Sequence, residues 1–127
     1  MSIRTPLARA KGLGSAKEGV AHWWAQRLTA VALVPLVIWF VISLIGLVGQ
    51  DHAALVTWLQ SPVQTALMVL LLVATFYHAQ LGMQVVIEDY VHGEGLKVAS
   101  LLAMKFVAFL LGAIAVVSVL RIAFGGA

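Results

Sequence analysis

The stretch "FYHAQLGMQVVIEDYV" contains the side chains best suited to chemistry. His78 lies within a long apolar run, and Glu88, Asp89 and Tyr90 follow where that run ends. Neutral imidazole is a common protein ligand for metals, haem iron included, whereas a phenol can donate a hydrogen bond and a carboxylate accepts one. The stretch therefore combines a candidate metal ligand with a candidate polar site about 18 Å further along one helix.

His78 has two interpretations. It lies about 15 Å from the nearer end of its apolar run, close to the middle of a bilayer. Ionisable residues at that depth are costly and usually face a bundle interior, so a neutral His hydrogen-bonded to a neighbouring helix explains it as well as ligation does. Gly82, Val85 and Asp89 fall within about 40° of His78 on a helical wheel. We expect the small Gly82 to leave room for a flat, bulky group.

The rest of the sequence indicates that these residues are carried by membrane-spanning helices. The chain has 127 residues, of which 62% are hydrophobic and 10% charged, with a mean hydropathy of +1.03. A soluble domain of this size could not bury so much apolar surface. We predict an all-α membrane protein, one domain over 1–127, whose three helices span about 28–48, 63–87 and 98–124. Lys105 and Arg121 of the third run are long enough to snorkel toward the two interfaces.

Basic residues predict the orientation of the chain. The predicted first loop has none and the second has Lys97, whereas the segment 1–27 contains Arg4, Arg9, Lys11, Lys17 and Arg27. The positive-inside rule therefore places the N-terminus and second loop in the cytoplasm and the C-terminus in the periplasm. We expect a bacterial inner membrane rather than a mitochondrial one. The net charge of +3 reflects this flank, and nucleic-acid binding is not expected.

Several classes of chemistry are excluded for this chain alone. The sequence has no cysteine, so it can form neither disulfides nor thiolate-bound metal or iron–sulfur sites. It also lacks Gly-rich phosphate-binding and dinucleotide-binding motifs.

The spacing around His78 resembles a known family. The small hydrophobic anchor subunits of succinate dehydrogenase, which form half of its cytochrome b, have a His in the second helix. Gly-Met follows it four and five residues later, and Asp-Tyr eleven and twelve residues later. The matching residues here are His78, Gly82, Met83, Asp89 and Tyr90. "RLTA", beginning at Arg27, is similar to the Arg-x-Thr-Ala that opens the first helix in that family.

This resemblance implies a function and a set of partners. It implies a haem b shared with a second anchor subunit, with His78 as one axial ligand to the iron, and a ubiquinone site formed in part by Tyr90 and Asp89. It implies Arg27 beside a haem propionate, although a snorkelling Arg explains that position as well. An iron–sulfur subunit and a flavoprotein subunit would oxidise succinate, so this chain would hold no catalytic residue of that reaction.

Other interpretations stay open from the sequence. The chain could anchor a quinol:fumarate reductase, which has the same architecture and catalyses the reverse reaction. It could instead be a small proton-conducting or purely structural membrane subunit. Tyr90 could be an interfacial anchor beside solvated acids, and His22 an interfacial packing residue, or a residue that meets a propionate or the quinone.

Overall fold

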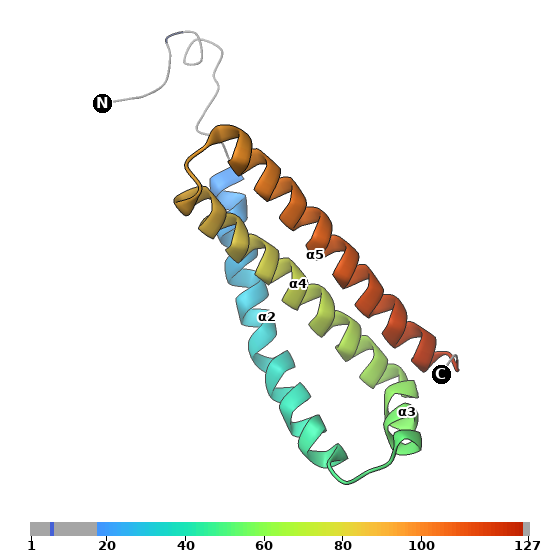
Figure 1. The fold of residues 1–127 in the computed structure, drawn as a ribbon. Coiled ribbons are helices and arrows are strands. Elements are labelled where there is room, and N and C mark those ends of the chain that lie inside the picture. Colours follow the sequence, from blue (N-terminus) through green and yellow to red (C-terminus); the bar gives the residue numbers. More distant parts are fainter. Residues whose placement is uncertain (1–5, 7–17, 126–127) are drawn as a thin grey trace.

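The computed structural model describes Pro6 and residues 18–125, and long helices dominate that part of the chain (Figure 1). The helices are α2 (Glu18–Leu47), α3 (His52–Gln60), α4 (Pro62–Tyr90) and α5 (Glu94–Ala123). The described residues contain no strand. Of these helices, α2, α4 and α5 are long and apolar enough to cross a membrane. The predicted all-α, three-span architecture is confirmed, whereas the orientation of the termini stays a prediction.

Helix α4 lies between α2 and α5 and packs against both, while the short α3 packs against α4 and α5 (Figure 1). The start of α2, the end of α4 and the start of α5 gather at one end of the molecule, which we call the head end. Helix α3 and the end of α5 lie near the opposite end. Residues at the head end are those that the positive-inside rule assigns to the cytoplasm.

Helix α2 begins about three turns earlier than the sequence predicted, at Glu18 rather than near residue 28. The prediction followed hydropathy, which detects only the part of a helix that lies in hydrocarbon. The preceding residues, "EGVAHWWAQR", continue the same helix with a polar and aromatic composition that suits a membrane interface. Pro35 lies inside α2 without ending it.

The predicted first loop also contains a helix that the prediction missed, α3. Asp51 caps its N-terminus, with the side chain accepting a hydrogen bond from the amide of Ala54 at 2.9 Å. Asp is among the best N-cap residues because its oxygen satisfies an amide that has no partner within the helix. Trp39 of α2 stacks on Trp58 of α3, with ring centroids 5.8 Å apart. Nε1 of Trp39 also donates a hydrogen bond to Oε1 of Gln64 at 3.1 Å.

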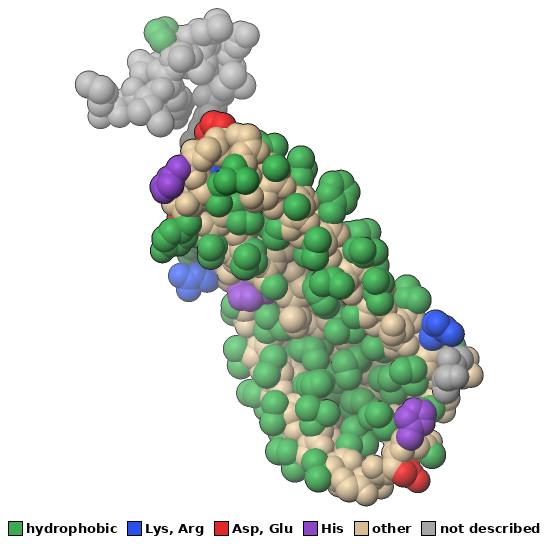
Figure 2. Space-filling model, viewed as in Figure 1, with side chains coloured by type: hydrophobic (Ala, Val, Ile, Leu, Met, Phe, Trp, Pro, Cys, Tyr) green, Lys and Arg blue, Asp and Glu red, His purple; other side chains and the backbone are tan. Residues whose placement is uncertain are grey.

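The chain buries little of its apolar surface by itself. The buried hydrophobic residues are Leu59, Leu71, Leu81 and Ile87, and none of the described polar or charged residues is buried as a whole. Hydrophobic side chains cover the length of the face shown in Figure 2, and acidic side chains lie near its two ends. Such a surface is stable only against lipid or other apolar helices.

Candidate functional site

His78 projects from the middle of α4 onto α2, where it meets Thr29. The Thr29 hydroxyl lies 2.9 Å from Nδ1 of His78. The same hydroxyl lies 2.7 Å from the carbonyl of Ala25 and 3.0 Å from that of Gln26, both one turn earlier in α2. His78 therefore has a hydrogen-bond partner on a neighbouring helix, as the simpler interpretation expected. Its hydrogen bonds to the described residues involve Nδ1 alone, so the second ring nitrogen, Nε2, is left for another partner.

A stripe of polar side chains on α2 continues from Thr29 toward the head end. It consists of His22, Gln26 and Thr29, which share one helix face because they are spaced by four and three residues. Nε2 of His22 and Oε1 of Gln26 are buried and have no hydrogen-bond partner among the described residues. Leaving a buried polar atom without a hydrogen bond costs about 1–3 kcal/mol of folding free energy. A polar group that bound to this stripe would therefore stabilise it.

Gly82, one turn from His78, is where the sequence predicted room for a flat group. A Cβ added at Gly82 would lie 3.7 Å from Nε2 of Gln26, which is ordinary van der Waals contact. A Cβ would therefore fit at Gly82, and the Gln26 side chain is the nearest group to that position. A larger group could reach the Gly82 backbone only if the Gln26 side chain rotated away from it.

Asp89 and Tyr90 lie at the end of α4, apart from His78. The Tyr90 side chain is 76% exposed, and Asp89 is exposed as well. Twelve residues separate His78 from Tyr90, which corresponds to about 18 Å along a helix. The structure therefore keeps the two candidate sites separate, as the spacing predicted, and leaves the phenol and carboxylate open to solvent or to another subunit.

A ladder of side chains runs along α4 toward the same end. Nε2 of Gln80 donates to Oε1 of Gln84 at 3.3 Å, and Nε2 of Gln84 donates to Oε1 of Glu88 at 3.1 Å. These contacts order the face of α4 that leads from the middle of the helix to the Asp89–Tyr90 pair.

Arg27 follows Gln26 directly in α2 but lies off the polar stripe and is exposed. Its guanidinium carbon lies 5.1 Å from the centre of the Trp23 ring, in the range of a cation–π contact. Trp23 in turn meets Trp24 edge to face, with centroids 4.9 Å apart. Within the described residues Arg27 thus stacks on an aromatic ring at the head end and does not lie against His78.

Sequence reasoning gave no role to Thr29 or Gln26, and it ranked His22 as a packing residue. One signal could have found them. In a helix that is otherwise apolar, polar residues spaced by four and three residues define one face, and that face must meet something polar. The hydrogen bond between Thr29 and His78 itself depends on how α2 and α4 pack, which the sequence pattern did not contain.

Known proteins are similar to this sequence along most of its length. The model of the succinate dehydrogenase/fumarate reductase transmembrane subunit family matches residues 1–112. A succinate dehydrogenase hydrophobic membrane anchor subunit of Rickettsia bellii is 34% identical, over 85% of this chain and 86% of the relative. That of Paracoccus denitrificans is 32% identical, over 84% and 82%. A succinate dehydrogenase membrane anchor subunit of Reclinomonas americana is 30% identical, over 72% and 79%.

These similarities confirm two predictions made from the sequence. Bacterial membrane anchors among the relatives, together with three helices suited to crossing a membrane, support a multi-pass protein of the bacterial inner membrane. The resemblance in the second helix is borne out by matches that cover most of the chain. The chain belongs to the family of succinate dehydrogenase/fumarate reductase transmembrane subunits.

Proposed function

We propose that this chain is a membrane anchor subunit of succinate dehydrogenase that supplies one axial ligand to a haem b and part of a ubiquinone-reduction site. Membership of the family supports the anchor role. The names of the relatives favour succinate oxidation over fumarate reduction. The chain has no cysteine. Electrons must therefore arrive from an iron–sulfur subunit, fed by a flavoprotein subunit, docked at the head end.

The contact between Thr29 and His78 carries the proposal of His78 as a ligand. A hydroxyl has one proton and two lone pairs. The contact of 2.7 Å to the Ala25 carbonyl is a common use of that proton for a Thr within a membrane helix. The Thr29 oxygen then accepts from Nδ1–H of His78 at 2.9 Å. With the proton on Nδ1, Nε2 keeps its lone pair, which is the form of the ring that binds a metal.

The neighbouring residues fit a haem in their chemistry. The two orphaned atoms on α2, Nε2 of His22 and Oε1 of Gln26, lie on the stripe that leads from Thr29 to the head end. A bound group with carboxylates pointing toward the cytoplasm would accept a hydrogen bond from Nε2 of His22 when that nitrogen carries the proton. Gln26 could turn its amide nitrogen to the same carboxylates. Arg27 at that end can offer a fork of donors suited to a carboxylate if it leaves the Trp23 ring. The haem, when bound, would supply one-electron redox chemistry.

The chain would provide only half of the axial ligation. The described residues contain no group of three or more His, Asp or Glu side chains that could hold a metal ion. His22 lies nearly two helical turns before Thr29 on α2, while His52 begins α3 and His92 follows α4. We therefore assign the second axial ligand to the partner anchor subunit, which would also cover part of the apolar surface that this chain exposes.

Tyr90 and Asp89 suit the quinone because they lie at the end of a helix, where protons are available. A quinone carbonyl accepts hydrogen bonds, so the Tyr90 hydroxyl is the direct donor and Asp89, an acceptor when ionised, has a supporting role. The high exposure of Tyr90 in the isolated chain leaves it free to complete a pocket with residues of the neighbouring subunits.

Replacement of His78 tests the ligand assignment. In the purified complex, His78→Ala should remove the low-spin signal of a haem with two His ligands from the electron paramagnetic resonance spectrum. His52→Ala is a matched control, since His52 is exposed at the opposite end of the molecule. An unchanged low-spin haem signal in His78→Ala, with the anchor still present, would exclude His78 as a ligand.

A further inference from the structure

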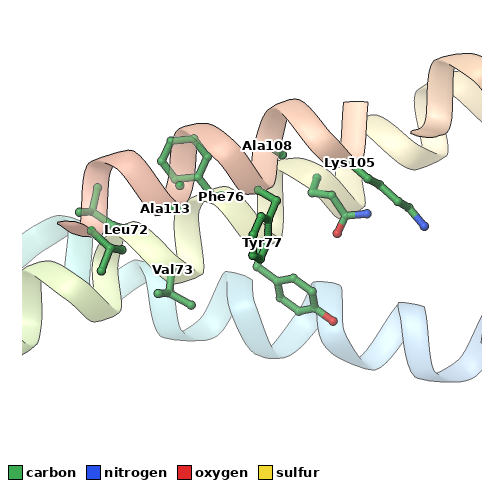
Figure 3. Close-up of a pocket in the computed structure, with 11 residues that line it drawn as sticks. Leu72, Val73, Phe76, Tyr77, Lys105, Ala108 and Ala113 are labelled. Atoms are coloured by element: carbon green, nitrogen blue, oxygen red, sulfur yellow. The ribbon is translucent and has the colours of Figure 1, made fainter. Parts of the chain in front are cut away.

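A groove between α4 and α5 is not used by the proposed function. Its cavity volume is about 580 Å³, and Leu72, Phe76, Gln80, Lys105 and Gly112 are among its lining residues (Figure 3). Lys105 is the only charged residue among those that line it. The groove thus combines a long apolar slot with one cation.

The polarity of the groove changes along its length. Gln80 and Lys105 lie toward the head end, and Leu72 and Val116 lie toward the opposite end. Figure 3 shows the Lys105 side chain extending along the helix toward the end where α2 begins, while Phe76 and Leu72 lie further along the slot. Lys105 and Val116 are eleven residues apart in α5, or about 16 Å. That length is about half of a hydrocarbon core of about 30 Å, which is the depth of one leaflet.

The depth of Lys105 suits a headgroup. If Arg121 marks the far interface, about 20 residues of helix span the hydrocarbon, and the near boundary falls close to Leu101. Lys105 then lies about one turn inside the boundary, and its flexible stem lets the ammonium reach the interface. At the interface the ammonium lies at the level of the lipid headgroups, where an anionic lipid attracts a Lys side chain.

We propose that this groove binds an anionic phospholipid of the cytoplasmic leaflet, with the phosphate on Lys105 and one acyl chain along the slot. Gly112 and Phe76 form the floor of the slot, since a Cβ added at Gly112 would lie 3.3 Å from the Phe76 ring. A carboxylate of a partner helix could also neutralise Lys105, but only by bringing a second charge out of water at a desolvation cost. A lipid phosphate already lies at this level of the membrane.

Native mass spectrometry of the delipidated, purified complex tests the proposal with phosphatidylglycerol and phosphatidylcholine as probes. One Lys near an anionic surface contributes about 1 kcal/mol, which corresponds to a preference of about fivefold for phosphatidylglycerol at this site. Lys105→Gln should abolish that preference, and Lys105→Arg should restore it. Ala113→Leu, which narrows the groove, should weaken binding of both lipids.

Two control variants separate the site from general effects on the helix. Lys97→Gln removes a cation from the head end of α5, and Ala103→Leu adds the same bulk outside the groove lining; both should keep the wild-type preference. A complex without a preference, or a preference that survives Lys105→Gln, would overturn the proposal. Loss of the partner anchor from Lys105→Gln complexes, with lipid preference intact in those that remain, would overturn it in favour of a protein carboxylate.

Discussion

Replacing Thr29 with Val should disturb the haem without removing it. Val has nearly the shape of Thr, so the packing of α2 against α4 is kept while the hydroxyl that lies 2.9 Å from Nδ1 of His78 is lost. In the tautomer that we propose, Nδ1–H then loses its acceptor between α2 and α4. Hydrogen bonds between membrane helices contribute about 0.6 kcal/mol on average and at most about 1.7, so most of the complex should still assemble.

The change in midpoint potential can be given a sign and a limit. A hydrogen-bond acceptor on Nδ1, the ring nitrogen that does not bind the iron, makes a His ligand more basic. A more basic ligand favours the oxidised iron, so loss of the acceptor should raise the midpoint potential. If the whole hydrogen bond of about 1.4 kcal/mol were made in one redox state alone, the shift would be about 59 mV for one electron. A partial difference between the two states predicts a rise of about 20–40 mV.

Potentiometric titration and electron paramagnetic resonance of the purified complex measure this effect. Thr29→Ser keeps the hydroxyl and should stay near the wild-type potential. Ser118→Ala is a matched control, because Ser118 also bonds the carbonyl one turn earlier, that of Ile114 at 2.7 Å, but is exposed on α5. A wild-type potential and unchanged resonance values in Thr29→Val would refute a positioning role for Thr29, even if the complex became less stable.

Two further substitutions test the head end. Tyr90→Phe should keep assembly and haem content but lower quinone reduction by up to about tenfold, the effect of losing one hydrogen bond of about 1.4 kcal/mol. Succinate oxidation by a dye that accepts electrons upstream is the control. Wild-type quinone reduction and inhibitor affinity in this variant would identify Tyr90 as an interfacial anchor. Arg27→Leu should lower the haem midpoint potential by removing a positive charge, and Arg27→Lys should lower it less; a titration without a shift would leave Arg27 as the partner of Trp23 at the interface.

Much of the architecture could be predicted from composition because a bilayer allows few solutions. Apolar runs longer than about 20 residues must be helices in lipid, which is why α4 and α5 lie close to their predicted positions. The errors in the predicted helix boundaries arose at the membrane interface, where the surroundings change from hydrocarbon to water. Hydropathy could not detect the first turns of α2 around His22, nor the short α3, whose start depends on the Asp51 cap.

The candidate site was predictable only where it lies on one helix. His78, Gly82, Asp89 and Tyr90 all belong to α4, so their relative positions follow from helical geometry alone. The partner of His78 lies 49 residues away in sequence, and nothing in the α4 pattern identifies Thr29. The position of the Gln26 amide against Gly82 likewise depends on packing between α2 and α4.

The two proposed sites make opposite demands on their surroundings, and α4 meets both because it is uninterrupted between them. A haem ligand needs a neutral nitrogen away from water, and His78 is partly buried against α2 near the middle of the helix. Quinone reduction needs protons, and Tyr90 is largely exposed at the helix end. An insertion of one residue between them would rotate Tyr90 by about 100° relative to His78. The twelve-residue spacing therefore fixes both the distance between the sites and the faces that they offer to neighbouring subunits.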